Sequence, residues 1–195
     1  METWSEHDEK VCHSPAWPGV EQCPARGQYA PPPWNKSPAL EKLIVQLKQQ
    51  YHSDNLFPVD KRKMTQVDNL SYFIRFHDRP DTPEYRLLKA YLWGVQETHI
   101  NSISQQIQTN VIPWFCPTGG LQAVGRNGQN PTQFIENVIW EALEKTLKVE
   151  PDRFQIYDGA SAFMSTTSFV MYGLQTRYPC YETIPESHRL VGFNY

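Results

Sequence analysis

Long apolar runs are missing from this sequence of 195 residues. No stretch approaches the roughly 20 consecutive apolar residues that a membrane-spanning helix requires, so we expect no contact with a membrane. The N-terminal residues are acidic and contain no apolar core of the kind that secretory signal peptides carry. Together these two absences predict an intracellular (cytoplasmic) protein or a component of a virion.

Positive charge is also scarce. The chain has 18 lysines and arginines against 21 aspartates and glutamates, which gives a formal net charge of −3 at pH 7. A protein that binds nucleic acid by neutralising its phosphates carries an excess of basic residues, so a nucleic-acid partner is disfavoured. The only basic run, at residues 61–63, is short and is typical of a solvated loop.

Cysteine is limited to Cys12, Cys23, Cys116 and Cys180. In a reducing compartment these residues are expected to be thiols. Cys12 and Cys23, together with His13, invite a zinc interpretation, but no second close pair completes a recognised ligand spacing. We therefore predict neither a metal site nor a bound cofactor.

Proline and aromatic residues, in contrast, are abundant at both ends of the chain. The N-terminal arm (residues 1–36) has no apolar periodicity and is rich in proline, which favours polyproline II or irregular coil. The C-terminal tail (residues 179–195) is again punctuated by proline. Because disordered segments are usually poor in aromatic residues, we interpret these rings as anchors for partner proteins. The predicted partner-binding residues are Trp4, Trp17, Tyr29 and Trp34 in the arm, and Tyr181, Phe193 and Tyr195 in the tail.

Residues 37–178 carry the patterns of a single folded domain. Apolar residues recur at spacings of three and four in four stretches, which predicts helices over residues 37–52, 65–77, 81–109 and 130–148. Ser37 and Pro38 suit the N-cap and first turn of the first helix. The polar residues 55–63 are expected to form a loop.

The helix expected over residues 81–109 is the longest element. Asp81 and Glu84 have the spacing of a capping box, and Pro83 suits the first turn. Asn110 tolerates the left-handed backbone of a helix C-terminus, and Pro113 forbids continuation of the helix. The apolar stripe of this helix comprises Tyr85, Leu88, Leu92, Val95, His99, Ile103 and Ile107, widened by Leu87 and Tyr91.

The C-terminal part of the domain predicts β-structure. Residues 154–157 alternate between apolar and polar, Asp158-Gly159 is a hairpin signal, and residues 168–178 have the composition of a longer strand. The sequence therefore predicts an α+β fold, in which about four helices pack on a small antiparallel sheet over residues 154–178.

The glycine-rich loop at residues 119–130 has a spacing similar to that of a phosphate-binding loop. Arg126 and Asn127 stand where such a loop needs Lys and Ser or Thr, but the N-terminus of a helix follows, and its amides can bind an anion. One interpretation is a structural turn with positive φ angles at its glycines. The other is an anion-binding site formed by Gly120, Gly125, Arg126 and Asn127.

No acid, base and nucleophile form a recognisable set in the sequence. His99 lies on an apolar stripe, where a histidine usually has a packing role, although Cys116 could approach it as a Cys/His pair. We expect a non-enzymatic structural or assembly subunit, such as a virion or tail component, that docks onto other protein subunits or onto copies of itself. The alternative is a small enzyme or anion-binding domain that uses the loop at residues 119–130.

Overall fold

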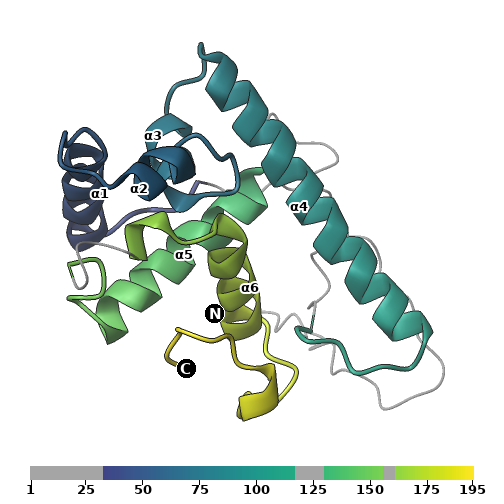
Figure 1. Cartoon of the computed structure of the whole chain (residues 1–195). Coiled ribbons are helices and arrows are strands. Elements are labelled where there is room, and N and C mark those ends of the chain that lie inside the picture. Colours follow the sequence, from purple (N-terminus) through teal and green to yellow (C-terminus); the bar gives the residue numbers. More distant parts are fainter. Residues whose placement is uncertain (1–32, 117–129, 156–160) are drawn as a thin grey trace, which may run out of the picture.

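The computed structural model describes residues 33–116, 130–155 and 161–195, and this part of the chain is helical (Figure 1). It contains no strand, and Asn69 and Ser165 form an isolated antiparallel bridge. The predicted α+β fold with a sheet over residues 154–178 is therefore wrong. The helices are α1 (Pro38–Tyr51), α2 (Pro58–Lys63), α3 (Leu70–Phe76), α4 (Pro83–Gln108), α5 (Gln133–Val149) and α6 (Thr166–Arg177), followed by the 3-10 helix η2 (Glu186–His188).

Helix α6 occupies the stretch in which the sequence predicted the longest strand. Ser165 caps it, because the Ser165 hydroxyl accepts a hydrogen bond from the backbone N–H of Thr167 at 3.2 Å. A helix that is buried on most sides shows no polar stripe, so its period is hidden in the sequence. This is the case for α6, whose buried residues are Thr166, Phe169, Val170, Tyr172, Gly173, Leu174 and Gln175.

Helix α5 is the central element, and α1, α4 and α6 all contact it (Figure 1). The closest approach is between α5 and α6 at Gly173. A Cβ atom at this position would lie 2.7 Å from both the Cγ1 atom and the carbonyl oxygen of Val138. Glycine therefore allows the two helix backbones to pack directly against each other, and their facing side chains form the middle of the core.

Helix α1 confirms the sequence prediction almost residue by residue. The Ser37 hydroxyl accepts a hydrogen bond from the backbone N–H of Leu40 at 3.1 Å, and Pro38 stands in the first turn. The whole predicted stripe is buried, and it consists of Leu40, Leu43, Ile44, Leu47 and Tyr51. Amphipathic periodicity and a cap were therefore sufficient to predict this helix.

The segment between α1 and α4 differs from the prediction at its boundaries. Residues 58–63, expected to be loop, form the short helix α2. The helix expected from residue 65 begins only at Leu70, with Asn69 as its N-cap. The Asn69 side chain also donates to the carbonyl oxygen of Phe163 at 2.9 Å. This contact ties the start of α3 to the segment that precedes α6, and fixes where the helix starts.

Helix α4 follows the predicted span closely, but its cap is Thr82 rather than Asp81. Asn110 has a φ of 56° beyond its C-terminus, as predicted. Leu88, Leu92 and Ile103 of the predicted stripe are buried, whereas Leu87 and Ile107 are 53% and 50% exposed. In Figure 1 the C-terminal half of α4 extends away from α6. Although α4 has 26 residues, none of the helices in the described residues is both long and apolar enough to cross a membrane.

A disulfide bond joins Cys116 to Cys180 and replaces the two thiols that the sequence led us to expect. The backbone N–H of Cys116 also donates to the carbonyl oxygen of Tyr178 at 2.7 Å. Phe115, next to the bridge, is 1% exposed. The chain that returns from the end of α4 is therefore fixed to the segment that leaves α6.

The close approach at Gly173 gives the first prediction. Gly173→Ala should lower the free energy of unfolding by about 1–3 kcal/mol, because the added methyl group overlaps the α5 backbone at Val138. The matched control is Gly94→Ala on α4, where a Cβ would meet no atom within 4 Å. That variant should gain up to about 1 kcal/mol from helix propensity. Urea denaturation of both variants, at a protein concentration low enough to keep the chain monomeric, measures the difference, and equal stabilities would contradict the packing described for Gly173.

Candidate functional site

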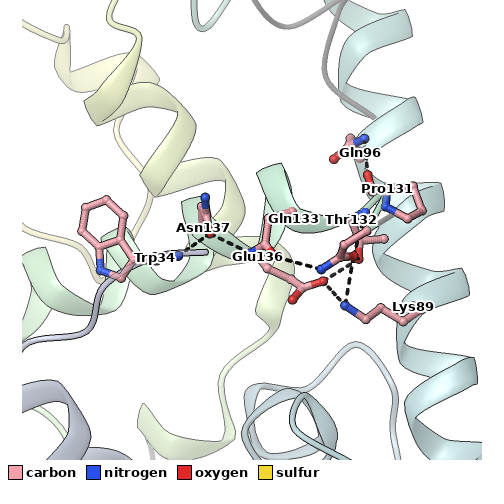
Figure 2. Close-up of polar contacts among 9 residues, drawn as sticks. Trp34, Lys89, Gln96, Pro131, Thr132, Gln133, Glu136 and Asn137 are labelled. Atoms are coloured by element: carbon pink, nitrogen blue, oxygen red, sulfur yellow. Dashed lines mark hydrogen bonds and ion pairs between the residues drawn. The ribbon is translucent and has the colours of Figure 1, made fainter. Parts of the chain in front are cut away.

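A group of connected polar side chains joins α4 to the start of α5 (Figure 2). The Lys89 ammonium on α4 donates to Glu136 Oε1 on α5 and to Asn130 Oδ1, the latter at 3.3 Å. The Thr132 hydroxyl lies within hydrogen-bond distance of both Asn130 Oδ1, at 2.9 Å, and the Glu136 carboxylate, and its single proton is shared between these two acceptors. We call these four residues, Lys89, Asn130, Thr132 and Glu136, the α4–α5 polar cluster.

Three further contacts extend this group along α5 and across to α4. The Gln133 amide donates to Asn137 Oδ1 at 2.9 Å, and the backbone N–H of Trp34 donates to the same oxygen at 2.8 Å (Figure 2). On the opposite side, the Gln96 amide donates to the carbonyl oxygen of Pro131 at 3.2 Å. The interactions therefore connect the first described residues of the chain to α4 through α5.

The α4–α5 polar cluster has the properties of a structural joint. Glu136 is 7% exposed, and its carboxylate accepts from an ammonium group and a hydroxyl. A buried carboxylate needs such partners, because an unpaired charge in a protein interior is very costly. The Thr132 hydroxyl, which lies beside this carboxylate, is itself in a residue that is only 1% exposed, so the pair is enclosed between the helices. In the part of the chain that the structure describes, no group of three or more His, Cys, Asp or Glu side chains is arranged to hold a metal ion.

The predicted anion-binding residues Gly120, Gly125, Arg126 and Asn127 lie outside the described residues. Asn130, at the end of that loop, is described. The sequence predicted a helix from residue 130, but α5 begins at Gln133 with Thr132 as N-cap. The Asn130 side chain instead accepts from Lys89 and Thr132. Lys89, a cation close to the start of α5, is thus already paired with Glu136.

The predicted partner-binding residues fall into two groups. Trp4, Trp17 and Tyr29 lie outside the described residues. Trp34, Tyr181, Phe193 and Tyr195 are described. Trp34 is half-buried against the core. Tyr181 is half-buried with its ring 5.3 Å from that of His188.

The end of the C-terminal tail packs on α6. The Phe193 ring is 8% exposed and stacks on Tyr172 with the ring centroids 4.6 Å apart. Tyr195 is 37% exposed, and its hydroxyl donates to Gln175 Oε1 at 2.6 Å. These contacts are within the same chain, and they close one side of the core.

His99 is a half-buried titratable group on α4. Its ring packs edge-on against Trp114, with centroids 5.3 Å apart, and its Nε2 atom has no hydrogen-bond partner among the described residues. Burial lowers the pKa of His99, because the charged imidazolium is desolvated. Cys116, the residue considered as its catalytic partner, is held in the disulfide and cannot act as a nucleophile in this state.

A cavity of about 720 Å³ opens beside α1 and α2. The apolar part of its lining includes Leu43, Leu47 and Phe154, and Gln46 and Gln50 contribute amide groups. An apolar side chain from another protein could enter such a cavity. The lining residues do not form the acid, base and nucleophile set that a reaction requires.

Three apolar side chains at the C-terminal end of α4 face solvent. Ile107, Val111 and Ile112 are 50%, 53% and 63% exposed, and we call them the α4 tip. The sequence between Glu97 and Arg126 contains no aspartate, glutamate, lysine or arginine. His99 is the one titratable imidazole in this stretch. The helical period predicts that Ile107 lies on the buried stripe, and it makes no prediction for Val111 or Ile112. The absence of charge in this stretch was the signal that could have revealed the surface.

No protein-family model, curated protein or solved structure matches this chain. Function must therefore be inferred from the sites and surfaces described above.

The second prediction tests the role of the α4–α5 polar cluster. Lys89→Met should lower the free energy of unfolding by about 2 kcal/mol or more, since it leaves the Glu136 carboxylate buried without its cation. In a double-mutant cycle with Glu136→Gln, the coupling free energy should be about 1 kcal/mol or more. The matched control is the more exposed pair of Lys48 and Asp78, whose nitrogen and oxygen are 2.7 Å apart. Its coupling should stay below about 1 kcal/mol, and equal coupling in the two pairs would contradict the proposed joint.

The third prediction concerns His99 and pH. Because burial lowers its pKa in the folded state, the unfolded chain binds a proton at a higher pH than the folded chain. The free energy of unfolding should therefore fall as the pH is lowered through about 6.5, the ordinary histidine value, towards the lower pKa of the folded state. His77, whose pKa burial also lowers, contributes in the same direction. Urea titrations between pH 8 and pH 5 should show a smaller loss in His99→Gln than in the wild type. An unchanged loss would contradict the burial of a neutral His99.

Proposed function

We propose that this chain is a non-enzymatic subunit of a larger assembly and that it docks onto other protein subunits. The observation that carries the proposal is the α4 tip, where Ile107, Val111 and Ile112 are each at least half exposed. Exposed apolar residues are ordinary when scattered, but neighbouring ones at the end of a projecting element are typical of contact sites. We propose that the partner presents an apolar surface to this tip.

The charge-free sequence around the α4 tip supports this proposal. Burying a charged group in an interface carries a large desolvation cost, and the centres of interfaces are accordingly depleted of charged residues. Between Glu97 and Cys116, the described residues are apolar or carry uncharged polar groups, apart from His99, whose pKa is lowered by burial. A partner can therefore cover the tip without removing a fixed charge from water.

The attachment of the tip also favours docking. Trp114 packs on His99, Phe115 is buried, and Cys116 is bonded to Cys180, so the chain beyond the tip is fixed to the core. A surface that is already ordered loses less conformational entropy when it binds.

The disulfide is relevant to the compartment in which such an assembly would function. Disulfide bonds persist in oxidising surroundings, including the surfaces of virions, and are rare in the cytosol. The bond between Cys116 and Cys180 therefore favours the virion alternative over a purely cytoplasmic protein. We retain Trp4, Trp17 and Tyr29 of the N-terminal arm as further proposed anchors, because tryptophan and tyrosine are enriched among the residues that dominate binding energy.

The fourth prediction tests the α4 tip. The full chain, isolated from the cells that produce it, should co-purify with a partner in fixed stoichiometry by native mass spectrometry. The double variant Val111→Asp and Ile112→Asp should lose this complex and keep the wild-type helical circular dichroism, because both side chains are exposed. The matched control is Val45→Asp on α1, a position that is 55% exposed, and it should keep the complex. A tip variant that still forms the complex would overturn the assignment of this surface.

A further inference from the structure

A second surface of α4, distinct from the α4 tip, runs along the outer side of the helix. Five residues spaced three or four apart face solvent there, and we call them the outer face: Leu87, Ala90, Gly94, Thr98 and Asn101. Leu87 is a large apolar residue, yet it is 53% exposed. A Cβ atom added to Gly94 would meet no atom within 4 Å, so the space above the middle of this face is open.

Opposite charges flank the outer face on one side. Arg86 and Glu97 are eleven residues apart, which brings them within about 20° of the same direction around a helix. Among the described residues, neither of these two side chains takes part in an ion pair or a side-chain hydrogen bond. Trp93, half-buried, lies between them on the same flank. This flank therefore carries a cation, a large aromatic ring and an anion, in that order along the helix.

In an antiparallel pair of α4 helices, the positive end of this row faces the negative end of the same row in the other copy. When two such helices run antiparallel about a two-fold axis, the same flank of both lies on the same side of the contact. If the axis passes near the level of Leu92, Ala90 of one helix faces Gly94 of the other. Arg86 of each copy then lies beside Glu97 of the other, and the two Trp93 side chains meet at the axis. Small residues at the crossing permit helix axes to approach to the short end of the usual 8–10 Å range.

We infer that the outer face of α4 binds the same face of a second copy of this chain, antiparallel, about a two-fold axis near Leu92. A two-fold interface must be self-complementary, since the same patch occurs on both sides. The reversed order of Arg86 and Glu97 meets that condition, and a partner bearing a single sign of charge would match only one of them. This interface adds to the proposed docking function and uses different residues from the α4 tip.

Charge reversal tests this inference on the full chain. Sedimentation equilibrium should show a dimer for the wild type. Arg86→Glu places two carboxylates together at each end of the contact, and Glu97→Arg places two guanidinium groups together. Each single variant should therefore dimerise at least about tenfold more weakly than the wild type. The matched control is Lys42→Glu, a charge reversal at an exposed position on α1, and it should dimerise like the wild type.

Mixing the two variants gives the decisive measurement. In a heterodimer of Arg86→Glu with Glu97→Arg, both ends of the contact again join opposite charges, so the equimolar mixture should recover the dimer. Recovery on mixing also shows that both variants are folded. A monomeric wild type, single variants that dimerise normally, or a mixture that stays monomeric would each overturn the inference. The variant of the α4 tip should remain a dimer, so failure of this interface and failure of the proposed docking surface are separately visible.

Discussion

The direct contact between the backbones of α5 and α6 at Gly173 is the constraint on which the rest of this fold depends. Only the absence of a side chain at that position lets Val138 reach the surface of α6. Helix α5 contacts α6 at this point and also contacts α1 and α4. The tail then closes α6 by stacking Phe193 on Tyr172. The other helices and the C-terminal tail therefore pack on the pair formed by α5 and α6.

The sequence could predict those helices that bury one face and expose the other to solvent. Helix α1 has a cap, a proline in its first turn and a single buried stripe, so local chemistry and tertiary packing agree. Helix α4 was predicted for the same reason, within two residues at each end. Helix α6 was not, because burial on most sides removes the polar stripe and leaves a composition rich in β-branched and aromatic residues. Its cap, Ser165, was the remaining local signal, and without periodicity it was too weak to decide between helix and strand.

The candidate sites show the same limit at longer range. Lys89 and Glu136 are 47 positions apart, and no local pattern pairs a lysine on one helix with a glutamate on another. The disulfide joins cysteines separated by 64 positions and contradicts the thiol state that the sequence predicted for Cys116 and Cys180. The exposure of Ile107 depends on where the core ends beneath α4, which is a property of the whole fold. The charge-free stretch after Glu97 could be seen in the sequence, but its meaning required knowledge of which of its residues face solvent.

The two surfaces of α4 have different consequences for assembly because they lie at different heights along one helix. A two-fold axis near Leu92 would direct the C-terminal ends of the paired helices in opposite directions. At 1.5 Å per residue, each end lies about 24 Å from the axis, so the two α4 tips of a dimer would be about 50 Å apart. Such a dimer presents two identical apolar tips to two different neighbours. A closed two-fold contact then supplies the unit, and the outward-facing tips supply the means by which the unit bridges other subunits.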